Sequence, residues 1–332
     1  MNTNAMALYE TLYDLASQDA ERELFGTSAQ LAQEAFEHAT EGTSAPTIWF
    51  EVPLSGPPRF DLHVAHGNTD LHRHAPFAPD AMDGHGGLLN WFASKPREGG
   101  GLALAYDVGD GRISAPAVHV NVNAAKAFDA EGFFAHVGRP EAAALYRDFA
   151  SRIPQGWRIW YFGVHPGRPD TPVRIDCYVS KNLKRAYAAE PTKLEEDLQK
   201  VGFAVEGSTV RCVGAKVAAS PFGLELQFDL LSDGALGQTV GISAQFPLMP
   251  ASAARQLWEA GGEAAQLMEF AVDSRAADAR WRRIPDTMFS TAVKNDNTWQ
   301  ALYCVPVFAK FRVRANKLLD TKIYLQAGAP NL

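Results

Sequence analysis

Apolar and polar residues alternate with a period of two in one segment of this sequence after another, and this pattern constrains the fold most. In residues 47–52 the Ile, Phe and Val side chains fall on one face of an extended strand, whereas Trp49 and Glu51 fall on the other. A Ser-Gly-Pro-Pro turn follows, and residues 60–64 repeat the alternation directly after Arg59. The two segments predict a β-hairpin with one apolar face and one charged face.

The same unit recurs four more times along the chain. Further strand pairs are predicted at 101–108 with 118–123, 157–164 with 173–180, 210–218 with 224–230, and 299–313 with 321–326. Residues 238–246 either extend the fourth pair or form a connection. Helical spacing predicts helices within 5–40, 88–94, 128–136, 140–151 and 251–273, and another that begins with a Thr192-x-x-Glu195 capping box. The chain is therefore expected to contain five helix-plus-hairpin units.

Five hairpins with one apolar face each need a common arrangement, because none can bury that face alone. One solution is an open antiparallel sheet with helices on one face and solvent on the other. The repeat count favours the other solution, an α+β fold in which ten antiparallel strands close into a β-barrel surrounded by helices. The polar faces then line the lumen. We expect residues 1–332 to form one such domain.

Composition and charge exclude several classes of protein. The 332 residues carry a net charge of -7, which disfavours nucleic acid or an anionic membrane as a partner, so a phosphate-bearing ligand must meet a local basic pocket. The three cysteines lie far apart and predict neither a disulfide framework nor a zinc ribbon. Neither a signal peptide nor a membrane-spanning apolar segment is recognisable, so the cytoplasm is the expected compartment.

The five successive α-β-β-α units resemble the aromatic prenyltransferases of the ABBA, or PT-barrel, fold. The strands 173–179 and 321–325, with the first hairpin carrying Glu51 and Arg59, are similar to the basic/Tyr strands and acidic first strand of cyanobactin-type peptide prenyltransferases. The strand Trp160-Tyr-Phe-Gly163 resembles members that act on small phenols. The resemblance covers nearly the whole chain, but it rests on architecture and pattern, without a diagnostic motif.

The resemblance implies transfer of a dimethylallyl or geranyl group from its diphosphate to an electron-rich aromatic or peptide side chain. Lys and Arg would bind the departing diphosphate, and aromatic rings would shield the allylic cation. Some members of the family use Mg²⁺ with the diphosphate and others use lumen cations instead. The sequence has no D-D-x-x-D-like motif, so Mg²⁺ is possible but not indicated, and no metal ligand is assigned.

Site residues follow from the inward positions of the predicted strands. The candidates for binding the diphosphate are Arg59, Arg174, Lys216 and Lys322. The candidates for shielding the cation are Tyr178 and Tyr324. Glu51 would orient the acceptor or take its proton. The candidate acceptor contacts are Trp49, His119, Glu225 and Gln227.

Each charged candidate also has a plainer interpretation, because single Arg and Lys residues on strands usually lie at the surface. The joint pattern, and no single residue, therefore carries the assignment. The run Lys310-Phe-Arg-Val-Arg314 fits a solvated strand edge and is left outside the predicted site.

Two other functions remain open. Five of the nine histidines crowd into residues 63–85 beside several aspartates, so a His-ligated metalloenzyme is one alternative. The segment is rich in Gly and Pro and lacks a helix-borne His-Glu-x-x-His arrangement, which favours a polar loop. A barrel that binds a peptide or small molecule without transforming it is the other alternative. At least two inward cations around a diphosphate-sized space would favour the enzyme.

Overall fold

The fold is described from a computed structural model of the chain. It describes residues 23–26, 34, 36–37, 47–95, 101–109, 112–122, 128–166, 170–205, 207–295 and 298–328. The two helices predicted within 5–40 lie largely outside these residues.

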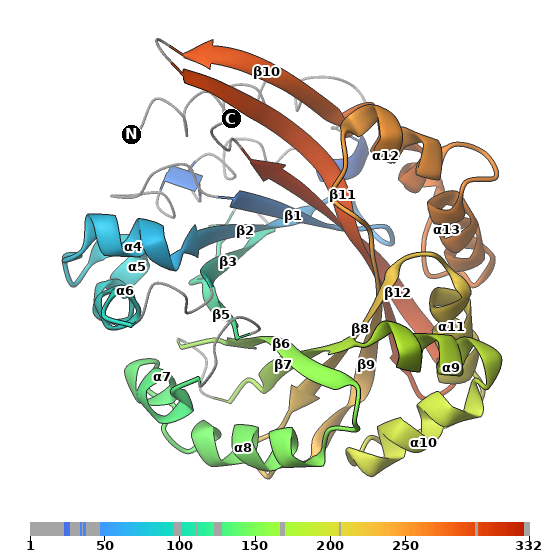
Figure 1. Cartoon of the computed structure of the whole chain (residues 1–332), viewed down its shortest axis with the longest axis horizontal. Coiled ribbons are helices and arrows are strands. Elements are labelled where there is room, and N and C mark those ends of the chain that lie inside the picture. The colour runs from blue at the N-terminus through green and yellow to red at the C-terminus, as the bar shows by residue number, and fades with distance from the viewer. Residues whose placement is uncertain are drawn as a thin grey trace.

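Ten strands close into an antiparallel barrel (Figure 1). They are β1 (Thr47–Pro53), β2 (Phe60–Gly67), β3 (Gly101–Gly109), β5 (Ala117–Asn121), β6 (Trp157–Val164), β7 (Val173–Val179), β8 (Gly223–Leu230), β9 (Leu236–Gln245), β11 (Thr298–Arg314) and β12 (Lys317–Gly328). Their order around the ring is β11-β12-β1-β2-β3-β5-β6-β7-β8-β9, and β9 pairs with β11 to close it. The predicted closed barrel is confirmed, and the open sheet is excluded.

On the edge opposite β12, the closing strand β11 pairs with two strands in succession. From Phe308 onward it pairs with β9, whereas its first part pairs with β10 (Phe289–Asn295), which lies outside the ring. Figure 1 shows β10 and the start of β11 extending beyond the other strands. A short strand, β4 (Arg112–Ile113), pairs with the end of β3.

Helices surround the barrel (Figure 1). They are α4 (Asn68–His74), α5 (Ala81–Gly84), α6 (Gly86–Ala93), α7 (Ala130–His136), α8 (Ala142–Arg152), α9 (Lys181–Ala189), α10 (Thr192–Lys200), α11 (Thr209–Ala219), α12 (Ala251–Trp258) and α13 (Glu263–Asp273), with a 3-10 helix at Ala279–Thr287. Within the described part of the chain, none of them has the length and apolar character to cross a membrane.

The core lies between the outer face of the barrel and these helices. Phe162 of β6 is fully buried, and its ring centroid lies 4.9 Å from that of Phe133 and 5.4 Å from that of Phe134, both on α7. The apolar residues of the alternating strands thus face outward into a packed layer. The polar residues are left to face the lumen.

One predicted strand is wrong, because residues 210–218 form most of helix α11. Its buried residues Val210, Val213 and Val217 recur at helical spacing, and α11 packs on the outside of the barrel. The strand that pairs with β8 is instead β9. The predicted capping box is also wrong: α10 begins at Thr192 itself, and the N-cap position is occupied by Pro191, whose side chain makes no capping bond.

Candidate functional site

The inner faces of the strands line a cavity in the lumen with about 700 Å³ of space free of atoms, part of it open to solvent. Almost all of its lining side chains are polar or aromatic. They are Trp49, Glu51, His63, Ala103, His119, Tyr161, Arg174, Asp176, Glu225, Gln227, Ser243, Phe308, Lys310 and Tyr324. The predicted polar lumen is therefore present.

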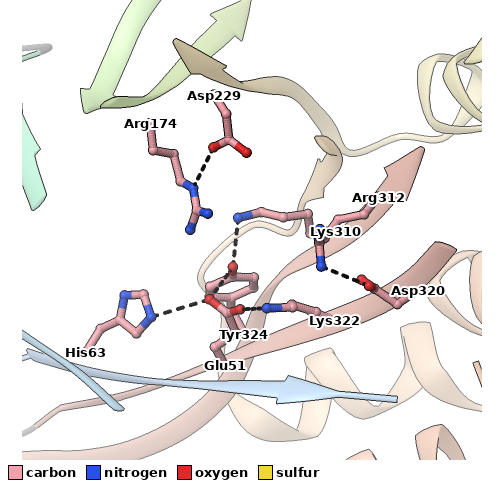
Figure 2. A network of polar contacts seen from close by, with 9 residues as sticks. All are labelled: Glu51, His63, Arg174, Asp229, Lys310, Arg312, Asp320, Lys322 and Tyr324. Atoms are coloured by element: carbon pink, nitrogen blue, oxygen red, sulfur yellow. Dashed lines mark hydrogen bonds and ion pairs between the residues drawn. The ribbon is translucent and has the colours of Figure 1, made fainter. Parts of the chain in front are cut away.

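Tyr324 lies at the centre of a hydrogen-bonded network on one wall (Figure 2). Its hydroxyl donates to Glu51 Oε2 at 2.5 Å and accepts from Lys310 Nζ at 2.7 Å. Lys322 Nζ contacts the other oxygen of Glu51, and His63 Nε2 lies 3.4 Å from Glu51 Oε2. We call Glu51, Lys310, Lys322 and Tyr324 the basic wall.

Strand register explains why these side chains meet. Glu51 of β1 is the cross-strand partner of Tyr324 on β12. Lys310 of β11 is the partner of Lys322 on the same β12. Residues directly opposite each other in an antiparallel pair have their Cβ atoms about 5 Å apart. The two lysines therefore project into the lumen side by side.

Burial and neighbouring charges shift the titration of this wall. Burial alone would raise the pKa of Glu51, but Lys322, His63 and Lys310 outweigh it and hold that pKa well below the usual range. Burial, together with the Glu51 charge, raises the pKa of Tyr324 well above its ordinary value. Burial lowers the pKa of Lys310, although Asp176 and Glu51 oppose this effect. Glu51 is thus a carboxylate and Tyr324 a neutral phenol.

Carboxyl groups dominate the wall formed by β7 and β8. Gln227 Nε2 donates to both oxygens of Asp176, at 2.9 and 3.0 Å. Glu225 is only 5% exposed, and its Oε1 has no hydrogen-bond partner. Burial, and then the Asp176 charge, raises the pKa of Glu225 to about 8. We call Asp176, Glu225 and Gln227 the acidic wall, in which Glu225 holds its proton at neutral pH.

Arg174 connects the two walls. It lies on β7 two residues before Asp176, and its Nε donates to Asp229 Oδ1 at 3.3 Å. Figure 2 shows its guanidinium pointing toward the contact between Lys310 and Tyr324. Burial would lower the pKa of Arg174, but Asp229 and Glu51 outweigh it and raise that pKa. A third cation therefore faces the two lysines across the cavity.

His119 lies deep in the lumen beside His63, with ring centroids 5.4 Å apart. Burial, and then the neighbouring His63 and Arg174, lowers the pKa of His119 well below its ordinary value, so the ring is neutral. Its cross-strand partner is Gly163, where an added Cβ would come within 2.9 Å of the imidazole. A glycine at this position of β6 makes room for the ring.

Most predicted site residues line the cavity, although their roles stay predictions. Glu51, Trp49, Arg174, His119, Glu225, Gln227 and Tyr324 line it, and Lys322 joins them through Glu51.

Three predicted residues lie elsewhere. Arg59 is exposed, and it lines a separate hollow with Asp61 and Arg112. Tyr178 lies on the inner face but beyond the cavity, with its ring 5.4 Å from that of Trp160. Lys216 was assigned wrongly to a strand: it lies on the outer helix α11, with its Nζ 6.0 Å from the ring centroid of Phe270.

Sequence reasoning missed Lys310, His63, Asp176, Ser243 and Phe308. Lys310 is the most consequential omission, since it is 8% exposed and lies within the lumen and not at a solvated edge. The signal was present, because Phe308, Lys310 and Arg312 alternate with three apolar residues. The three basic residues Lys310, Arg312 and Arg314 lie close together in the sequence, and this concentration of charge is typical of a solvated strand edge.

The described residues do not support the metalloenzyme alternative. Among them, no group of three or more His, Cys, Asp or Glu side chains is arranged to hold a metal ion. The histidine-rich segment is spread over β2, α4, α5 and the turns beside them, and His72 Nε2 lies 2.7 Å from the carbonyl oxygen of Lys95.

Comparisons with known proteins give likenesses to solved structures but no sequence match. No family model matches the sequence, and no curated protein matches it. A solved structure that does match is AnaPT from Neosartorya fischeri, at 11% sequence identity and a TM-score of 0.49. The match covers 99% of this chain and 92% of that chain.

Proposed function

We propose that the lumen binds an allylic diphosphate and transfers its isoprenyl group, dimethylallyl or geranyl, to an electron-rich aromatic or peptide side chain. The observation that carries this proposal is the convergence of three cations on the polar cavity: Arg174 and Lys310 line it from facing sides, and Lys322 reaches it through Glu51. The chain as a whole is acidic, with a net charge of -7. Such a local concentration of positive charge fits an anionic ligand.

The cations are only partly compensated by the protein. Lys310 Nζ is bound to the uncharged hydroxyl of Tyr324, and among the residues described it has no carboxylate within ion-pair distance. Lys322, directly opposite, carries the same charge, and like charges at such cross-strand positions are destabilising. Burying a charge without a full partner is also costly. A bound diphosphate would offset both costs.

The same cations would promote ionisation of the substrate. When the bond between the allylic carbon and the diphosphate oxygen breaks, the electron pair remains on the diphosphate. Fixed ammonium and guanidinium groups stabilise that developing charge more than they stabilise the intact substrate. In a chamber partly shielded from water, such an interaction lowers the barrier by more than it would in bulk solvent.

Aromatic rings around the cavity are suited to the allylic cation that remains. Trp49, Tyr161, Phe308 and Tyr324 all line the cavity. Their faces attract a cation without forming a bond to it. The raised pKa values of Tyr161 and Tyr324 keep both hydroxyls protonated, so they are poor nucleophiles toward the cation. The acceptor then attacks the allylic carbon and releases a proton.

The acidic wall is the candidate contact for the acceptor. The unpaired Oε1 of Glu225 can accept a hydrogen bond from an N–H or O–H group. Its pKa of about 8 also lies near the range useful for proton transfer at neutral pH.

Mass spectrometry can test the proposal directly. The protein is incubated with dimethylallyl or geranyl diphosphate and with tryptophan, tyrosine or short peptides, and isoprenyl adducts and released diphosphate are measured. We expect adducts with wild type, strong loss in Arg174→Met, and little change in Arg59→Met, the matched arginine outside the cavity. Allylic diphosphate binding without adduct or diphosphate release would favour a non-catalytic barrel. Equal activity of the two variants would refute the assigned diphosphate site.

A further inference from the structure

A second hollow lies at one rim of the barrel, apart from the lumen cavity. It encloses about 1130 Å³ of space free of atoms, part of it open to solvent. Its lining comes from the end of β7, helix α9, the start of β8 and the segment after β9. We call this hollow the rim groove.

The rim groove is basic. Lys181, Lys184 and Arg185 all line it, at spacings of three and four residues that place them on one face of α9. Lys184 Nζ donates to the carbonyl oxygen of Ser220. Lys181 and Arg185 are exposed, and among the described residues neither has an ion-pair partner. The described lining includes neither Asp nor Glu, although acidic residues outnumber basic ones in the chain.

The rest of the groove is largely apolar. Leu248 is 61% exposed, which is unusual for a large apolar side chain in this structure. It lies beside Pro247 and near Phe222, and the Phe222 ring centroid is 4.6 Å from that of Phe246. An inorganic anion would leave this apolar surface exposed to water. An amphipathic occupant with acidic and apolar groups would cover both parts.

The groove continues onto the inner face of the barrel. Tyr178 lines the groove and lies on the same strand face as Asp176, two residues away on β7. Gln245 lines it too, on the same face of β9 as Ser243 of the lumen cavity. Same-face neighbours on a strand lie roughly 7 Å apart. A chain seated in the groove could therefore extend one side chain toward the acidic wall.

We infer that the rim groove binds an acidic peptide segment carrying apolar residues, and that this segment presents the acceptor side chain to the lumen. The acidic residues would pair with Lys181 and Arg185, and an apolar residue would cover Leu248. The second half of the inference rests on the proposed function. The first half, peptide binding, does not.

Fluorescence anisotropy with the full chain tests the binding. The probes are fluorescein-labelled short peptides of Glu, Leu and Ser, with Gln or Lys replacing Glu in two matched peptides. The groove variant is Lys181→Glu with Arg185→Glu. The control is Arg314→Glu with Lys317→Glu, an exposed pair at the opposite end of the barrel. We expect the acidic peptide to lose about tenfold in affinity in the groove variant and less than about twofold in the control.

Added salt and a second variant distinguish the contribution of the basic side chains of the groove from that of its apolar surface. Added salt should weaken binding of the acidic peptide to wild type but hardly affect its residual binding to the groove variant. Leu248→Ser should weaken binding while leaving the salt dependence unchanged. Equal affinity of the acidic, Gln and Lys peptides would overturn the inference. So would equal losses in the groove and control variants, or binding to anionic phosphatidylserine vesicles in place of peptide.

Transfer assays distinguish this inference from the proposed function. In the groove variant, KM for an acidic peptide acceptor should rise about tenfold with kcat unchanged, while KM for free tryptophan stays constant. Specific peptide binding without transfer to any acceptor would refute the lumen reaction and leave the binding site intact. Transfer to peptides with an unchanged KM would refute the groove as the acceptor site.

Discussion

Across the lumen, the basic wall on β1, β11 and β12 differs from the acidic wall on β7 and β8 in how its buried polar groups are partnered. On the basic wall, Glu51 has both oxygens bound, and Tyr324 joins it to Lys310. On the acidic wall, Asp176 is held by Gln227, but one oxygen of Glu225 lacks a partner. The basic wall is therefore held in place before any ligand arrives, whereas the acidic wall has an unfilled contact.

If the proposed function holds, the difference suits the two walls to different tasks. Cations must be fixed in place to stabilise charge that develops on a leaving group, because reorganisation would cost energy during the reaction. A group that binds the acceptor needs a free lone pair for a hydrogen bond, and it can take the acceptor's proton only in its ionised form, which a pKa of about 8 leaves as a minor fraction at neutral pH. The following changes test this division, from the largest expected effect to the smallest.

Removing Lys310 should have the largest effect on transfer. Lys310→Met keeps an unbranched side chain, one heavy atom shorter, but deletes the charge, and we expect turnover with dimethylallyl diphosphate to fall by about a hundredfold to a thousandfold. Lys216→Met, on the outer helix α11, is the matched control and should retain turnover within about twofold. Steady-state kinetics measure both variants, with circular dichroism to verify folding. Comparable turnover in the two would contradict an anion-binding basic wall.

Glu225→Gln should change how stability depends on pH. The pKa of Glu225 is raised in the folded state to about 8, from 4.5 for an ordinary Glu. The unfolded chain therefore loses this proton first, and the wild type loses stability as pH rises from about 4.5 toward 8, by on the order of 4 kcal/mol. Glutamine cannot ionise, so the variant should lack this loss.

Urea unfolding at pH 5 and pH 8 measures that difference. The variant should exceed wild type in stability at pH 8 and resemble it near pH 5. Parallel stability curves for the two proteins would show that Glu225 ionises normally in the folded state.

Tyr324→Phe tests the link within the basic wall. Without the hydroxyl, the contacts to Lys310 and Glu51 are lost while the ring remains. We expect turnover to fall about tenfold, because Lys310 is less firmly positioned. Tyr146→Phe on the outer layer is the control, since its ring packs against Phe162 on the outside of the barrel. An unaltered rate for Tyr324→Phe would show that the ring alone matters.

Asp176→Asn tests the coupling within the acidic wall and should have the smallest effect. The Asp176 charge is the second cause, after burial, of the raised pKa of Glu225. Its removal should lower that pKa below about 8, without restoring the ordinary value, because the burial remains. Carbon-13 NMR titration of labelled glutamate carboxyls measures the change. A pKa that stays at about 8 would assign the whole shift to burial.

The fold was predictable from the sequence wherever alternation was unambiguous. Once the strands are recognised, alternation alone places Trp49 on the same face as Glu51. It likewise places Lys322 on the same face as Tyr324. Residues 210–218 were mispredicted because valine favours strands, while Val210, Val213 and Val217 also fit one helical face. Packing against the outside of the barrel favoured the helical period over the strand period of two.

The site was less predictable than the fold. Arg59 follows the inward pattern of its hairpin, but it precedes the first residue of β2 and reaches solvent. The contact of Lys310 with Tyr324 depends on how β11 pairs with β12, and β11 has a register shift between Pro306 and Phe308. Such an irregularity changes which residues face each other, and alternation alone does not reveal it.

The pairing of β12 with β1 has a consequence for the order of events during synthesis. Glu51 and Tyr324 are separated by 273 positions, yet their side chains share a hydrogen bond. While a ribosome is still making the chain, the early hairpins can fold but have no partner for the outer edge of β1. Neither the ring nor the chamber exists until β11 and β12 have emerged. A chain interrupted before this point would display two open strand edges, which cellular quality control could recognise before a closed chamber is formed.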